Sequence, residues 1–157
     1  MASGEAFVVE GKLRVPYDNW YGTLASAFFR ELRDHGKIRG IRCPACEKVY
    51  MPPRSVCPRC LGTLSVWVDL PPTGTLQTFT VVHYDYGQYY QPMKPPYLLG
   101  IIRLDGADTG LCHLLGECHL LGEVEQQELA PGLRVEARFR EDRKGNILDI
   151  VYFRPIR

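Results

Sequence analysis

The chain has 157 residues, a formal net charge of +1, 45% hydrophobic residues and 24% charged residues, as expected for a soluble globular protein of one large or two small domains. The near-neutral charge gives no general reason to expect nucleic acid or a membrane surface as a partner, and no run approaches the roughly 18 apolar residues that cross a bilayer. The first residues lack the basic and apolar regions of a signal peptide, and six cysteines, four of them at metal-ligand spacing, favour a reducing cytoplasm.

Residues 1–40 are expected to form an arm and one helix. Residues 1–16 look irregular and end at Pro16, after which Asp18 or Asn19 offers an N-cap for a helix that begins near Trp20. Gly36 provides the stop. The helix carries two adjacent apolar stripes: Trp20, Leu24, Ala27, Phe28 and Leu32 on the first, and Tyr21, Ala25 and Phe29 on the second.

A helix that is apolar on more than one side must bury both sides. A small zinc ribbon has little core to offer, so we predict that part of this helix packs on another subunit. Trp20, Tyr21, Phe28 and Phe29 would be the anchors, because large aromatic side chains dominate such interfaces. The alternative is that the helix packs entirely within its own chain.

Residues 41–66 carry the strongest signal in the chain, two Cys-x-x-Cys pairs separated by ten residues. Each pair, Cys43 with Cys46 and Cys57 with Cys60, suits a short turn that presents two thiolates, and residues 47–56 suffice for one hairpin between the turns. Four protein ligands close a tetrahedral site, which predicts structural zinc with no position for a catalytic water. Iron is the lesser alternative for a site of four thiolates.

The same region is rich in positive charge. Residues 30–60 contain eight basic side chains against three acidic ones, which suits a phosphate-bearing ligand or an acidic partner, the alternative being an ordinary solvated surface. Arg54 follows Pro52 and Pro53 near the middle of the predicted hairpin. A guanidinium on a stiff tip is well placed for a phosphate or carboxylate, although a surface salt bridge would equally explain it.

Residues 67–157 are predicted to form a five-stranded barrel. Residues rich in Thr, Val, Ile, Phe and Tyr, punctuated by Gly and Pro, predict strands at 75–84, 97–104, 110–117 or longer, 133–141 and 147–154. The clearest alternation places Leu133, Val135, Ala137 and Phe139 inward. A hairpin turn is expected at residues 144–146 and a short helix at 125–129. A helix between the third and fourth of five strands is typical of an OB-fold.

Residues 83–97 form a loop with five tyrosines, among them Tyr84 and Tyr97, together with Lys94. The loop after the first OB strand commonly faces a ligand, and tyrosine suits an interface, a ligand mouth or stacking on single-stranded bases. The alternative is a loop folded over its own barrel. His83 and Asp85 lie here too, but no nucleophile accompanies them, and we predict no catalytic residue in the chain.

Residues 112–117 recur unchanged as residues 118–123. Adjacent Cys and His side chains of a strand point to opposite faces, so Cys112 and His113 with their repeats, Cys118 and His119, are not expected to share one ion. We expect buried thiols and surface imidazoles instead.

The order of these motifs resembles the domain-of-unknown-function-35 (DUF35) family. A leading helix precedes residues 42–46, 52–54 and 57–60, and residues 74–80 and Pro131-Gly132 follow in the barrel. The resemblance covers nearly the whole chain and implies a rubredoxin-like zinc ribbon followed by an OB-fold. Two features depart from the family pattern: Glu47 stands where a glycine is common after the second cysteine, and the hexapeptide repeat looks like an insertion.

The resemblance also implies a function: a non-catalytic, zinc-binding partner of a thiolase-like enzyme (an acyl-CoA C-acyltransferase) that helps to hold or channel acyl-CoA. Related proteins serve archaeal isoprenoid synthesis or anaerobic breakdown of aromatic compounds, so a bulky or aromatic acyl-CoA, as in benzylsuccinate-type β-oxidation, is one expectation. Arg54, Lys94, Tyr84 and Tyr97 are the candidate contacts to coenzyme A. An OB-fold that binds single-stranded nucleic acid is the alternative, and a free-standing acyl-CoA thioesterase is the weaker one.

Overall fold

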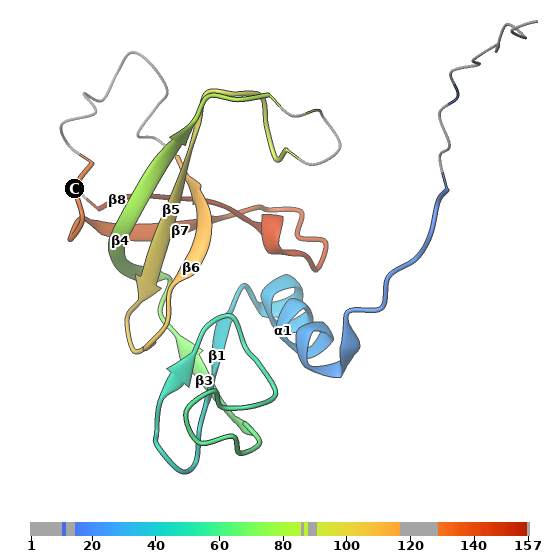
Figure 1. The fold of residues 1–157 in the computed structure, drawn as a ribbon, viewed down its shortest axis with the longest axis vertical. Coiled ribbons are helices and arrows are strands. Elements are labelled where there is room, and N and C mark those ends of the chain that lie inside the picture. Colours follow the sequence, from blue (N-terminus) through green and yellow to red (C-terminus); the bar gives the residue numbers. More distant parts are fainter. Residues whose placement is uncertain (1–10, 12–14, 86, 88–90, 117–128, 157) are drawn as a thin grey trace, which may run out of the picture.

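The computed structural model describes residues 11, 15–85, 87, 91–116 and 129–156, which form one helix, a small three-stranded sheet and a barrel (Figure 1). The helix and the small sheet comprise α1 (Gly22–His35), β1 (Ile38–Arg42), β2 (Val49–Tyr50) and β3 (Val66–Leu70). The barrel comprises β4 (Thr73–Val82), β5 (Tyr97–Leu104), β6 (Leu111–Leu115), β7 (Arg134–Phe139), the 3-10 helix η2 (Ile147–Asp149) and β8 (Ile150–Pro155).

The barrel is closed in the order β4-β5-β6-β8-β7, with a parallel pairing between β6 and β8 at Leu115 and Phe153. This arrangement confirms the predicted five-stranded OB-like barrel. The strand β5 has its predicted bounds, whereas the segment predicted as the last strand begins with the 3-10 helix η2. Most of the predicted helix at 125–129, the whole second copy of the hexapeptide and three of the five loop tyrosines lie outside the described residues.

The inward residues of β7 were predicted correctly. Val135 and Ala137 are buried, and Leu133 and Phe139 pack against the same core. The turn at residues 144–146 is also present: Gly145 adopts a φ of 82°, and Asn146 caps η2 by accepting a hydrogen bond from the Leu148 amide at 2.9 Å.

The helix α1 begins later than the sequence predicts. Tyr21 is its N-cap residue and makes no side-chain capping bond, so neither Asp18 nor Asn19 is the cap. At the other end Gly36 adopts a left-handed φ of 64° and its amide donates to the Leu32 carbonyl at 3.1 Å, as expected for a glycine stop. No helix in the described part of the chain is long and apolar enough to cross a membrane.

The two stripes of α1 meet different surroundings. Phe28 and Leu32 are buried in a core shared with the ribbon and the barrel, and Phe29 packs at its margin. The prediction that Phe28 anchors a partner is therefore wrong, because the barrel adds apolar surface that the ribbon alone lacks. Phe29 is half-buried, so its role as an anchor stays a prediction. Trp20 and Tyr21, by contrast, are 83% and 63% exposed at the start of the helix.

The small sheet has the order β2-β1-β3 and is fixed to the barrel by hydrogen bonds at β2. The Asp108 carboxylate, in the turn between β5 and β6, accepts from the Val49 amide at 2.9 Å and from Lys48 Nζ at 2.6 Å. Thr109 Oγ1 accepts from the Met51 amide at 2.8 Å. The strand β3 pairs with β1, so residues 66–70 complete the ribbon sheet, although the sequence assigns most of them to the barrel domain.

The faces of β6 are the reverse of the expected ones. His113 is buried against the ring of Phe153, with a centroid separation of 5.7 Å, and Cys112 is exposed. Leu111 and Leu115 share the inward face with His113, and this pair of leucines places that face in the core. The expectation of a buried thiol and a surface imidazole is therefore wrong for the copy of the repeat that the structure describes.

Candidate metal centre and its surroundings

Two similar turns present the four cysteines. In the first, the Glu47 amide donates to the Cys43 carbonyl at 2.9 Å, and in the second the Leu61 amide donates to the Cys57 carbonyl at 2.8 Å. Glu47 and Leu61 are the non-glycine residues of the described chain with positive φ, at 60° and 56°. Glu47 is thus left-handed where related sequences commonly have a glycine, and Leu61 occupies the equivalent position after the second pair. The sequence signal for both left-handed residues is their position directly after a Cys-x-x-Cys pair.

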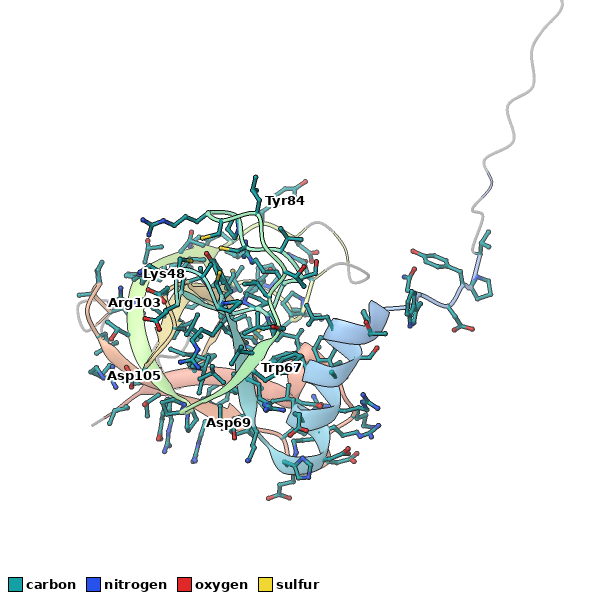
Figure 2. The ribbon with its side chains drawn as sticks, turned by 90° about the horizontal axis from the view of Figure 1, so that it is seen from below. Lys48, Trp67, Asp69, Tyr84, Arg103 and Asp105 are labelled. Carbon is teal, nitrogen blue, oxygen red and sulfur yellow. The ribbon has the colours of Figure 1, made fainter. Side chains whose placement is uncertain are left out.

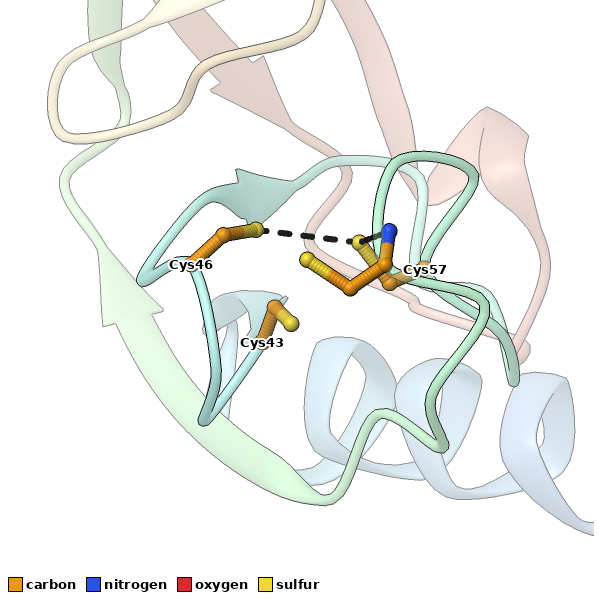
Figure 3. Close-up of side chains that lie close together, drawn as sticks. Cys43, Cys46 and Cys57 are labelled. Carbon is orange, nitrogen blue, oxygen red and sulfur yellow. Dashed lines mark hydrogen bonds between the residues drawn. The ribbon is translucent and has the colours of Figure 1, made fainter.

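The four sulfur atoms converge on one point (Figure 3). All four lie within 4.8 Å of one another, and Cys46 Sγ and Cys57 Sγ are 3.7 Å apart. A tetrahedral site with Zn–S bonds of about 2.3 Å requires sulfur separations of about 3.8 Å. The distances and the four-thiolate donor set therefore fit zinc, which would be held by Cys43, Cys46, Cys57 and Cys60.

The site is closed on its inner side. Cys43 and Cys57 are buried with Ile41, Tyr50 and Leu64 in a small apolar cluster, while Cys60 is exposed. Four protein ligands leave no coordination position for a substrate or water, so a bound zinc ion would supply folding energy to the ribbon and no catalysis.

Tyr50 is the residue next to the ligands that sequence reasoning did not single out. Its hydroxyl lies 3.2 Å from Cys57 Sγ, and the Cys60 amide donates to the same sulfur at 3.4 Å. The hydrogen bond from Tyr50 is the main cause that lowers the pKa of the Cys57 thiol, to about 6, and it raises the pKa of Tyr50 to about 12. Both effects favour a Cys57 thiolate that faces a neutral phenol.

The residues predicted to contact coenzyme A do not form one cluster within this chain. Arg54 is exposed on the ribbon, with its guanidinium 5.3 Å from the centre of the Tyr50 ring. The loop that contains Tyr84 and Lys94 lies at the other end of the barrel (Figure 1). Tyr84 is exposed at the periphery of the molecule (Figure 2), whereas Tyr97 is only 2% exposed.

Much of the basic region is neutralised by acidic residues of other segments. Arg39 and Lys37 pair with Asp69 at 2.8 and 2.9 Å, and Lys48 pairs with Asp108 at 2.6 Å. Arg39 also lies 5.4 Å from the centre of the Trp67 ring. Figure 2 shows Trp67 and Asp69 near α1, on the strand that runs toward the barrel. The ion pairs leave fewer free cations than the sequence count suggests.

His83 and Asp85 are the possible acid–base groups in the described part of the tyrosine loop. The Asp85 carboxylate accepts from the Gly87 amide at 2.9 Å, which stabilises the turn, and His83 is exposed.

The fold and the cysteine cluster thus define a protein that joins a four-cysteine zinc ribbon to an OB-fold barrel. Two family models match in this order: the rubredoxin-like zinc ribbon domain of ChsH2 over residues 30–65 and the C-terminal OB-fold domain of ChsH2 over residues 67–140. Together they cover most of the chain. The chain belongs to this family of DUF35 proteins, as the resemblance in its sequence predicts.

Similar proteins agree with this membership. A "DUF35 domain-containing scaffold protein" of Methanocaldococcus jannaschii is 28% identical over 133 residues, which cover 82% of this chain and 88% of that protein. The solved "Ltp2-ChsH2(DUF35) aldolase" shares the fold with a TM-score of 0.58 at 20% identity, covering 87% of this chain and 98% of that one. A DUF35 protein of unknown function from Sulfolobus solfataricus gives a TM-score of 0.54 at 21% identity, covering 74% of this chain and 78% of that one.

Proposed function

We propose that this chain is a non-catalytic subunit of a thiolase-type acyl-CoA complex in the cytoplasm, where it docks on the enzyme and helps to bind or channel acyl-CoA. The zinc ribbon, α1 and the barrel share hydrogen bonds and one apolar core, which makes them a stable platform for a partner. The names of two similar proteins, a scaffold protein and an aldolase assembled with a DUF35 chain, support this role.

One observation carries the docking part of the proposal. Val15, Tyr17, Trp20 and Tyr21 are all more than 60% exposed within seven residues at the start of α1. Figure 1 shows this segment extending away from the ribbon and the barrel. Exposed aromatic residues this close together are typical of interface anchors, because tryptophan and tyrosine contribute large contact areas at low entropic cost.

The alternative of single-stranded nucleic-acid binding is less well supported. Lys37, Arg39 and Lys48 are already paired with carboxylates, so they contribute little to a free positive groove. The weaker thioesterase alternative requires a nucleophile with a general base beside it, and the sequence offers no evident nucleophile near His83.

The test is purification of the tagged chain from its native host, followed by identification of the accompanying subunit. We expect a thiolase-like protein, with carbon–carbon bond activity in the complex and none in the isolated chain. A Trp20→Ala/Tyr21→Ala double variant should lose the partner, since these two side chains are exposed and outside the core.

Ile156→Ala is the matched control for the double variant. Ile156 is an exposed apolar residue at the end of β8, and Figure 1 places that end of the chain on the opposite side from the arm. Zinc content should be unchanged in every variant. A lone monomer that binds oligonucleotides with steep salt dependence would contradict the proposal and favour the nucleic-acid alternative.

A further inference from the structure

A second candidate site lies on the barrel, away from the metal centre. It is a cleft of about 330 Å³ between the segment that leads into β5, the end of β6 and the start of β8. Its lining is mostly apolar and includes Met93, Tyr97, Leu114, Leu148, Val151 and Tyr152. The volume falls at the lower end of the range for small-molecule sites, which are likewise mostly apolar with a few polar groups.

The strand geometry explains why the cleft exists. The strands β6 and β8 pair at a single position, Leu115 with Phe153, and the Gly116 amide donates to the Phe153 carbonyl at 2.9 Å. Leu115 and Phe153 fill the core, whereas Leu114 and Tyr152, their neighbours in sequence, are only half-buried and line the cleft. A short parallel pairing thus leaves an apolar surface between two strands, and no other strand of the described chain covers it.

The side chain of Arg140 provides a positive charge at this apolar cleft. Arg140 lines the cleft and is exposed, and no carboxylate of the described residues pairs with its guanidinium. Three other arginines are engaged: Arg134 pairs with Asp105, Arg154 with Glu136, and Arg143 donates to the Arg33 carbonyl at 2.8 Å. A planar guanidinium beside an apolar cleft matches a ligand with a carboxylate at one end.

We propose that this cleft binds a small carboxylic acid whose remainder is an aromatic ring or an alkyl chain, with the carboxylate on Arg140 and the apolar part against Leu114, Val151 and Tyr152. The volume suits an acyl-sized molecule better than a complete coenzyme A. This site needs neither a partner subunit nor coenzyme A, so it goes beyond the docking role and is tested separately from it.

The test uses the zinc-loaded full chain and isothermal titration calorimetry at pH 7. The probes are 3-phenylpropanoate and octanoate, each compared with the uncharged alcohol of the same skeleton. We expect both acids to bind saturably and about tenfold more tightly than their alcohols, the factor that one charge-assisted hydrogen-bond pair contributes. Arg140→Gln should abolish this preference. Arg138→Gln, two residues earlier on β7 and outside the cleft, should keep it.

A second pair of variants tests the apolar part. Leu148 is 43% exposed at the edge of the cleft, so Leu148→Trp should obstruct it and reduce the affinity for acids and alcohols alike by tenfold or more. Ile156→Trp is the control, because Ile156 is 41% exposed and does not line the cleft. Zinc content and circular dichroism verify folding. No saturable binding, equal affinity for acids and alcohols, or unchanged binding in both Arg140→Gln and Leu148→Trp would overturn the proposal.

Discussion

The hydroxyl of Tyr50 should strengthen zinc binding, and Tyr50→Phe tests this with the loss of one atom. The variant keeps the ring that packs in the ribbon cluster and lies beneath Arg54. It removes the hydrogen bond to Cys57 Sγ at 3.2 Å, while the Cys60 amide still donates to that sulfur at 3.4 Å. A lone pair on a buried thiolate then loses its neutral donor, which costs metal affinity.

The size of the effect follows from the number of donors lost. Removing a group that supports a metal ligand typically reduces affinity by about 10- to 100-fold. Because Cys57 keeps the Cys60 amide, we expect the lower end, about tenfold. The assay is competition with the chromophoric chelator 4-(2-pyridylazo)resorcinol at pH 7.5.

Tyr21→Phe is the control for this assay, since the Tyr21 ring is exposed and makes its ring contact with Phe29 rather than with a ligand. Its zinc affinity should equal that of the unmodified chain. If Tyr50→Phe also binds zinc within twofold of the unmodified chain, the hydroxyl does not support the site and the reasoning is refuted.

Three further predictions concern the core. Phe28→Ala should lower the free energy of unfolding by about 3–5 kcal/mol in urea titrations, because Phe28 is buried. Tyr21→Ala, at an exposed position, should change it by less than about 0.5 kcal/mol. Equal effects of the two substitutions would contradict the assignment of Phe28 to the core. Asp149→Asn should cost about 2–3 kcal/mol, since the buried carboxylate accepts from the amides of Lys144, Gly145 and Asn146, and an unchanged urea midpoint would refute this. Burial lowers the pKa of His113 below its ordinary value of about 6.5, so the unfolded chain binds the proton more readily than the folded chain. The free energy of unfolding should therefore fall as pH drops below about 6.5. A His113→Gln variant should lose this part of the acid dependence.

The sequence was sufficient where the chemistry is local. Two Cys-x-x-Cys pairs predict four converging thiolates because each pair closes its own turn, and the structure brings all four within 4.8 Å. Gly36 and the turn around Gly145 were predictable for the same reason, since both require a positive φ that glycine adopts freely. The alternation from Leu133 to Phe139 fixed the inward face of β7, because charged residues occupy the other face.

The tertiary structure alone decided which of several apolar surfaces is buried. The helix α1 has two stripes, and only packing on both ribbon and barrel places Phe28 inside and leaves Trp20 outside. Both faces of β6 carry apolar residues, so the alternation along the strand does not decide which face is buried. Only the structure shows that His113 faces the core and Cys112 the solvent. The contacts of Asp108 with β2 join residues about 60 positions apart. A sequence pattern records spacing along the chain, whereas such contacts depend on which surfaces meet when the chain closes on itself.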